Sequence, residues 1–175
     1  MQPSFDLRIR TMIKAMNEVV IPAVDSDNQA ALDQARLVAA SLDMLIEQID
    51  YAHWFEIADI QLMNRMISAL TEITPTETAD LAKAVAVTAM QAASRHEVSL
   101  PEIREHTRLL RDRISDLIES VGMLNDPKKL AQANEIILKL SQPQLDRERA
   151  FVAKTGFDTS PETLKSIREA LEQKD

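Results

Sequence analysis

The chain has 175 residues, of which 45% are hydrophobic and 27% are charged, and its formal net charge is −8. It contains two glycines, seven prolines and no cysteine. The lack of cysteine excludes disulfides and thiolate zinc sites. Two glycines are too few for a glycine-rich phosphate loop or for the tight turns of a multi-stranded sheet. The composition therefore predicts an all-α protein, and the length predicts a single helical-bundle domain over residues 1–175.

Charge and hydropathy also narrow the expected partners. An acidic chain lacks the basic surface with which proteins bind nucleic acid nonspecifically, so no nucleic-acid partner is expected. No segment approaches the roughly 18 apolar residues of a membrane-spanning helix. Glu18 and Pro22 follow Lys14 too soon for the apolar core of a signal peptide. We therefore expect a cytoplasmic protein with no membrane contact.

Prolines and glycines mark most of the predicted helix boundaries. Apolar residues at helical spacing predict a first helix over residues 5–20, ended by Pro22 because proline lacks an N–H donor. Pro143 falls inside a later helical pattern and predicts a kink or a restart there. Gly122 and Gly156 are expected at helix ends. Three further helices are predicted to begin where a capping residue precedes a proline, at Thr74-Pro75, Ser99-Leu100-Pro101 and Asp126-Pro127.

The longest uninterrupted segment lies between the first two of these boundaries. Neither glycine nor proline occurs from Asn28 to Thr74, and strong helix formers fill the segment. This pattern predicts one long helix over about residues 27–73. The alternative is a break near Asp50–Trp54. With the long helix at its centre, the expected fold is an antiparallel bundle of five to six helices.

On a helical wheel the predicted long helix carries two apolar stripes on roughly opposite sides. The broader stripe is a core face, and Asp59 falls on a polar flank between the two. Large exposed apolar patches are rare on monomers, so the second stripe is predicted to be an oligomer interface, most simply of a two-fold homodimer. The alternative is that the first and last helices of the same chain cover it. The second stripe consists of Leu37, Met44, Tyr51, Phe55, Leu62 and Met66.

His53 and Glu56 are the candidate polar pair of the core. Residues three apart are neighbours on a helix, and a buried carboxylate needs a partner or a proton. The pair could act as acid and base or supply two metal ligands. Carboxylate-bridged metal bundles need Glu-x-x-His on two helices. Here the order is His-x-x-Glu and it occurs once, so no metal site and no cofactor is predicted. The alternative is that the two side chains satisfy each other or an arginine from another helix.

Arginines form a stripe on the helix that follows Ser99. Guanidinium groups suit carboxylates and phosphates, and Arg104, Arg108 and Arg111 share one face. Acidic residues interleave with them, so ion pairs within the helix are the preferred interpretation.

These patterns predict a non-catalytic interaction or structural protein that acts as a homo-oligomer. No Gly-x-Ser-x-Gly turn or other nucleophile arrangement occurs in the chain. The alternative is a small-molecule- or metal-binding bundle, which could include an enzyme, that uses His53 and Glu56.

Overall fold

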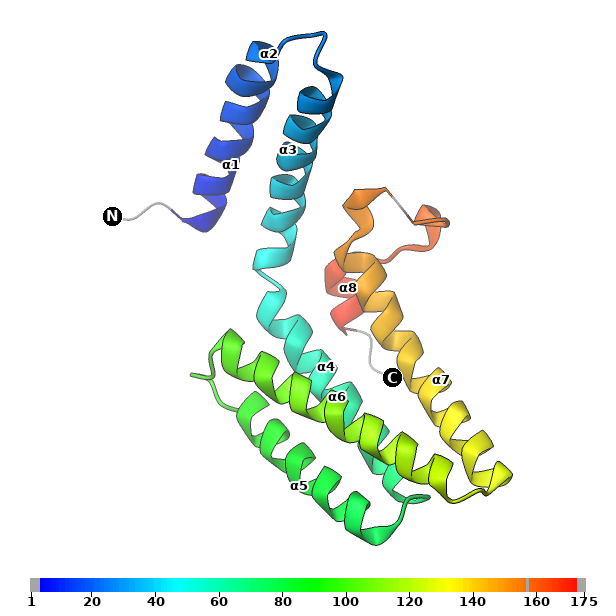
Figure 1. The fold of residues 1–175 in the computed structure, drawn as a ribbon. Helices are drawn as coiled ribbons and strands as arrows, with labels where there is room; N and C mark the ends of the chain where they lie inside the picture. The colour runs from blue at the N-terminus through cyan, green and yellow to red at the C-terminus, as the bar shows by residue number, and fades with distance from the viewer. Residues whose placement is uncertain (1–3, 157, 173–175) are drawn as a thin grey trace. The chain divides into compact units, whose positions relative to one another are not determined.

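The computed structural model describes residues 4–156 and 158–172 and confirms the all-α prediction (Figure 1). In this part of the chain no helix is both long and apolar enough to cross a membrane. The α-helices are α1 (Phe5–Ala15), α2 (Ile21–Ala23), α3 (Gln29–Ile49), α4 (Ala52–Thr71), α5 (Thr76–Ala93), α6 (Leu100–Met123), α7 (Pro127–Phe151) and α8 (Ile167–Glu172).

The described residues group into two compact units. Unit 1 holds those up to Tyr51 together with those from Arg149 to Ile167. Unit 2 holds Ala52–Glu148 together with those from Arg168 onward. A single domain over residues 1–175 stays a prediction.

The segment predicted as one long helix, about residues 27–73, contains two helices, α3 and α4. The Tyr51 N–H bonds to the Gln48 carbonyl at 3.1 Å, three residues back rather than four, and this closes the last turn of α3. The break lies in the alternative interval Asp50–Trp54. Aspartate is a weak helix former, so Asp50 is a permissive place for a helix to end even without glycine or proline.

Unit 1 is built on an antiparallel hairpin of α1 and α3 (Figure 1). Residues from the far end of the chain are bonded to α3. The Gln48 side chain donates to the carbonyl of Phe151 at 2.6 Å. Lys154 pairs with Asp43 at 2.8 Å and with Glu47 at 2.9 Å. Unit 1 therefore depends on two segments that are distant in the sequence.

The first helical segment passes its predicted end at Pro22. Met16–Val20 is π-helical, with the Ile21 N–H bonded to the Met16 carbonyl, and the helical path ends at Ala23. A proline lacks an N–H and crowds the preceding turn, and a wider π turn accommodates both effects.

The core of unit 2 lies between α4, α5 and α6, which pack together pair by pair. All the buried residues of α5 are alanines. Such small side chains allow neighbouring helices to approach closely. The large apolar side chains of α4 and α6 that are fully buried are Ile60, Leu62, Ile67, Leu70, Ile103, Leu110, Leu117 and Val121.

The sequence predicts a kink or a restart at Pro143, and α7 runs through this residue without a restart. Ala133, Ile136 and Leu140 pack against the core formed by α4, α5 and α6. This packing holds the helical path although the proline removes one backbone hydrogen bond.

The two glycines differ in their roles. Gly156 has a φ of 71° in the left-handed region and ends a helical turn, as predicted. Gly122 is the second-last residue of α6, so it lies near the predicted helix end but is not the residue that follows the helix. The helix ends instead before Asn125, whose φ is 51°. Asparagine tolerates this region better than most residues with a side chain, so it replaces glycine here.

Candidate functional site

The predicted pair His53 and Glu56 lies at the start of α4, where each side chain has its own partner. His53 is exposed, and its Nε2 donates to the Val98 carbonyl oxygen at 3.2 Å. Glu56 is half-buried and accepts from Arg104 Nε at 3.0 Å and from the Thr107 hydroxyl at 3.4 Å. The predicted core position of His53 is wrong, because the turn before α4 interrupts the core stripe of α3.

His53 and Glu56 each bond to a different partner, so their contacts are those of structural residues rather than of one reactive site. An acid and its base, or two ligands of one metal, have to converge on one small volume. Among residues 4–156 and 158–172, no three His, Cys, Asp or Glu side chains are grouped so that they could hold a metal ion. Glu56 instead follows the alternative interpretation, in which an arginine from another helix satisfies it.

Asp59 forms a buried ion pair that the sequence pattern did not predict. Asp59 is 0% exposed and Arg147 is 5% exposed. Arg147 Nη2 donates to Asp59 Oδ1 at 2.8 Å, and Arg111 Nη2 lies 3.5 Å from Oδ2. Burial raises the pKa of Asp59, while the hydrogen bond and charge of Arg147 act against that rise. In the described part of the chain Arg147 Nε has no hydrogen-bond partner.

The arginine stripe of α6 supplies partners to both acidic residues of α4. Arg104 and Arg111 are two turns apart and reach across to Glu56 and Asp59 on α4. The prediction of ion pairs within the helix is therefore wrong for these two. It is right for Arg108, which pairs with two acidic residues of its own helix. The acidic residues are three apart and the arginines are seven apart, so their spacings gave no clue to this pairing.

The six residues predicted as an oligomer interface are divided between the two units. Leu37 is 58% exposed, whereas Met44, Tyr51 and Phe55 are half-buried. Leu62 and Met66 are 1% and 6% exposed, so they are not available to a second chain. This part of the prediction is corrected, because residues of α6 and α7 line the same side of α4.

Unit 1 has a different apolar surface, on one side of the α1–α3 hairpin. Phe5 and Met12 of α1 are 69% and 52% exposed, and Val38 and Leu45 of α3 are 47% and 42% exposed. Each pair is seven residues apart and so follows one stripe of its helix. We call these four residues the hairpin face.

Helix geometry places both stripes on the same side of the hairpin. The inward direction is marked by the buried residues Ile9 on α1 and Ala35 and Ala39 on α3. On a wheel with about 100° per residue, each stripe is rotated about its helix axis by roughly 40–100° from the inward direction, and the sense of rotation is the same in both helices. Because the two helices are antiparallel, equal rotational offsets lie on the same side (Figure 1). The hairpin face is therefore continuous across both helices.

Charged residues of the hairpin gather on the opposite side. Asp43 and Glu47 lie there and bind Lys154. Arg10 of α1 also lies there, and its pKa is raised chiefly by Asp6 and further by Asp43. By the same wheel geometry, Arg8 is the one charged residue of α1 and α3 that borders the hairpin face.

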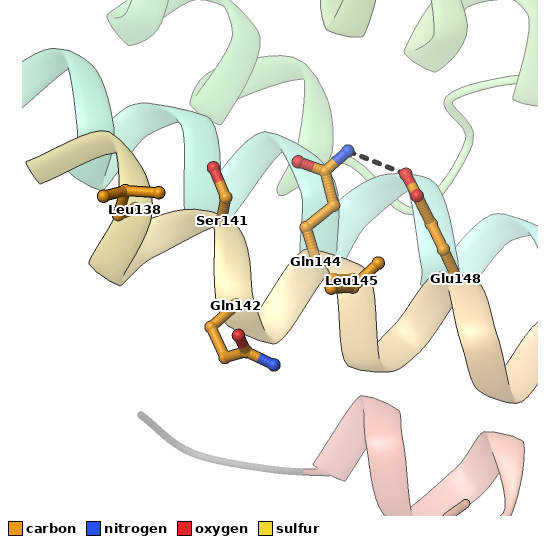
Figure 2. A pocket seen from close by; sticks show the side chains of 6 residues that line it. All are labelled: Leu138, Ser141, Gln142, Gln144, Leu145 and Glu148. Atoms are coloured by element: carbon orange, nitrogen blue, oxygen red, sulfur yellow. Dashed lines mark hydrogen bonds between the residues drawn. The ribbon is translucent and has the colours of Figure 1, made fainter. Parts of the chain in front are cut away.

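A smaller apolar stripe lies on the outward side of α7. Figure 2 shows Leu138 and Leu145 there, 74% and 49% exposed, beside Gln144, whose amide donates to Glu148 at 2.9 Å. The stripe belongs to one helix and contains only two large apolar residues, so it offers much less apolar surface than the hairpin face.

The residues of these two surfaces do not identify a chemistry. The hairpin face is apolar, and the α7 stripe adds common polar side chains such as Ser141 and Gln144. Comparison of the chain with protein-family models, with curated proteins and with solved structures found no match.

Proposed function

We propose that the protein is a non-catalytic interaction protein that assembles as a homodimer, with the hairpin face of each copy packed against that of the other. The observation that supports this is that the hairpin of unit 1 leaves more large apolar side chains exposed than it buries. The hairpin buries small residues such as Ala35 and Ala39, while larger apolar side chains stay in water on the hairpin face. Contiguous apolar surface of this kind is typical of interaction sites.

The spacing of the hairpin face favours another helical hairpin as its partner. Apolar residues seven apart on antiparallel helices form the seams of four-helix bundles, and two hairpins placed face to face make such a bundle. α3 has 21 residues and is therefore about 32 Å long. Two helices, each about 10 Å wide, present a side of roughly 600 Å², which is near the ~800 Å² per partner of a standard interface.

The charge distribution favours a second copy of this chain in particular. The net charge is −8, so most surfaces of two copies repel each other. The hairpin face carries no acidic residue, because the carboxylates of α1 and α3 lie on the other side. The centres of protein interfaces are depleted in charged residues in the same way.

The dimer is tested by placing carboxylates on the hairpin face. The double variant Val38→Asp/Leu45→Asp should raise the dimer dissociation constant by at least about 100-fold, since two charges would have to be desolvated in each copy. Sedimentation equilibrium should give a dimer for the native chain and a 19.7 kDa species for the variant.

Leu37→Asp is the matched control, because Leu37 is also exposed on α3 but points away from the hairpin face. It should leave the dimer intact. Circular dichroism should show equal helix content in all three proteins. A native chain that sediments as a monomer at micromolar concentration would refute the proposal. Dissociation by Leu37→Asp alone would place the dimer contact on the Leu37 side of α3 instead of on the hairpin face.

A further inference from the structure

Helix α7 is held less closely than the other helices of unit 2. The backbones of α4, α5 and α6 approach one another closely, whereas among the described residues α7 makes few such approaches to any helix. None of the large apolar side chains of α7 is fully buried. In unit 2 its exposed ones are Leu130, Leu138 and Leu145, and its half-buried ones are Ile136, Ile137 and Leu140. Since apolar burial is the main stabilising term in packing, α7 contributes less to the core than α4 or α6 does.

The contact between α7 and the core is also partly polar and incompletely filled. The only buried residues of α7 in unit 2 are Ala133 and Arg147. A groove of about 240 Å³ lies between α4, α6 and α7, and Ser141 and Gln144 line it from the α7 side. Pro143 lies between these two residues and leaves one backbone hydrogen bond of the helix unmade. Few apolar contacts would therefore be lost if α7 moved away.

The buried ion pair opposes such a movement only weakly. Arg147 Nη2 bonds to Asp59 Oδ1 at 2.8 Å, but both groups lose their hydration in this position, and that cost offsets most of their attraction. In the described part of the chain the buried Nε of Arg147 has no acceptor. Water would reach both side chains if α7 left the core.

The surface that α7 covers is apolar. Leu62 and Met66 of α4 are 1% and 6% exposed and line the groove beside α7. The contacts of α4 with α5 and α6 do not involve α7. The three-helix core can therefore stay packed while this part of α4 becomes uncovered.

We propose that α7 is a detachable cover, which leaves α4 and α6 reversibly while α4, α5 and α6 stay packed. Opening exposes Leu62 and Met66 and hydrates Asp59 and Arg147. Closing withholds this apolar surface from solvent and from other molecules. Local opening of the least buried element is the usual form of sub-global unfolding in proteins.

Hydrogen exchange of the native chain, measured by mass spectrometry, tests the opening without any variant. The amides of residues 130–146 in α7 should exchange at least about 100-fold faster than those of residues 60–70 in α4 and 105–120 in α6. A factor of this size corresponds to two fewer large apolar side chains buried. Equal protection of the three helices would show that α7 opens only when all of unit 2 unfolds, and would overturn the proposal.

Thiol labelling tests which surface the opening exposes. The chain has no cysteine, so Met66→Cys supplies a single thiol under α7. The matched control is Ile67→Cys, because Ile67 is 1% exposed and does not line the groove beside α7. At a low concentration of Ellman's reagent the rate follows the population of the open form. The Met66→Cys thiol should react at least about 100-fold faster than the Ile67→Cys thiol, each rate being divided by that of the urea-unfolded variant. Equal rates would contradict the proposal.

The ion pair gives a further comparison within the Met66→Cys chain. Arg147→Met should speed the labelling about tenfold or more, because Asp59 then lacks its closest partner only while α7 is closed. Arg108→Met removes an arginine that pairs within α6 and should leave the rate unchanged. An unchanged rate in Arg147→Met would also overturn the proposal. All three measurements concern unit 2, so their failure leaves the proposed dimer untouched.

Discussion

Replacing Arg147 by Met should lower the free energy of unfolding of unit 2 by about 3–5 kcal/mol, the usual cost of removing one partner of a buried ion pair. Asp59 would remain fully buried, with Arg111 at 3.5 Å as its remaining partner. Urea unfolding followed by the fluorescence of Trp54, the single tryptophan, reports on unit 2, because Trp54 lies in α4.

Two further variants show how much of this loss of stability is due to burial of the ion pair and how much to the loss of one charge. Arg104→Met removes an ion pair whose arginine side chain is 59% exposed, and it should cost less than about 1 kcal/mol. Asp59→Leu/Arg147→Met replaces both buried charges with apolar groups and should recover most of the lost stability. If Arg147→Met costs no more than Arg104→Met, the Asp59–Arg147 pair does not stabilise the position of α7.

The pH dependence of stability follows from the raised pKa of Asp59. Burial raises the pKa above its usual 3.8, so the unfolded chain releases this proton at a lower pH than the folded chain does. The contribution of Asp59 to stability therefore falls as pH rises through the interval between the two pKa values. Arg147→Met removes a group that lowers this pKa and should widen the interval. Comparison with Asp59→Asn/Arg147→Met isolates the effect from those of the other carboxylates.

Replacing Ala89 by Leu should destabilise unit 2 by roughly 1–3 kcal/mol, because extra methylene groups have no space in a close helix contact. Ala89 is 0% exposed on α5, which packs against both α4 and α6. Ala84→Leu, on the exposed side of the same helix, should change stability by less than about 0.5 kcal/mol. Thermal unfolding of the two variants gives the comparison, and equal midpoints would contradict the close packing of α5.

Local chemistry made much of the fold predictable. The Ser99 hydroxyl accepts the Glu102 N–H at 3.3 Å, as its place before Pro101 predicts. Asp126 likewise accepts from the N–H of Lys128 at 2.9 Å at the start of α7. The donor and the acceptor of such a cap are only two or three residues apart in the chain, so the sequence alone is enough to predict the interaction.

The parts that were not predicted depend on distant residues. No breaker stands at Asp50–Tyr51, so the end of α3 has no local mark. Asp59 and Arg147 are 88 positions apart, and no pattern in either helix links the two. The stripe of Phe5 and Met12 can be found from its spacing alone. Its continuation onto α3 depends on the antiparallel pairing of the two helices, and a helical wheel of one helix gives no information on that pairing.

The division of unit 1 between the two ends of the chain has a consequence for its synthesis. The contact between Lys154 and Asp43 spans 111 residues, and the whole segment Ala52–Glu148 of unit 2 lies between them. During translation the hairpin emerges early, with its apolar side uncovered, while the lysine that neutralises its acidic side is still to be made. Closing so long a loop has an entropic cost and slows folding. The α1–α3 hairpin is thus synthesised before unit 2, and unit 1 is completed only after the sequence of unit 2 has been made.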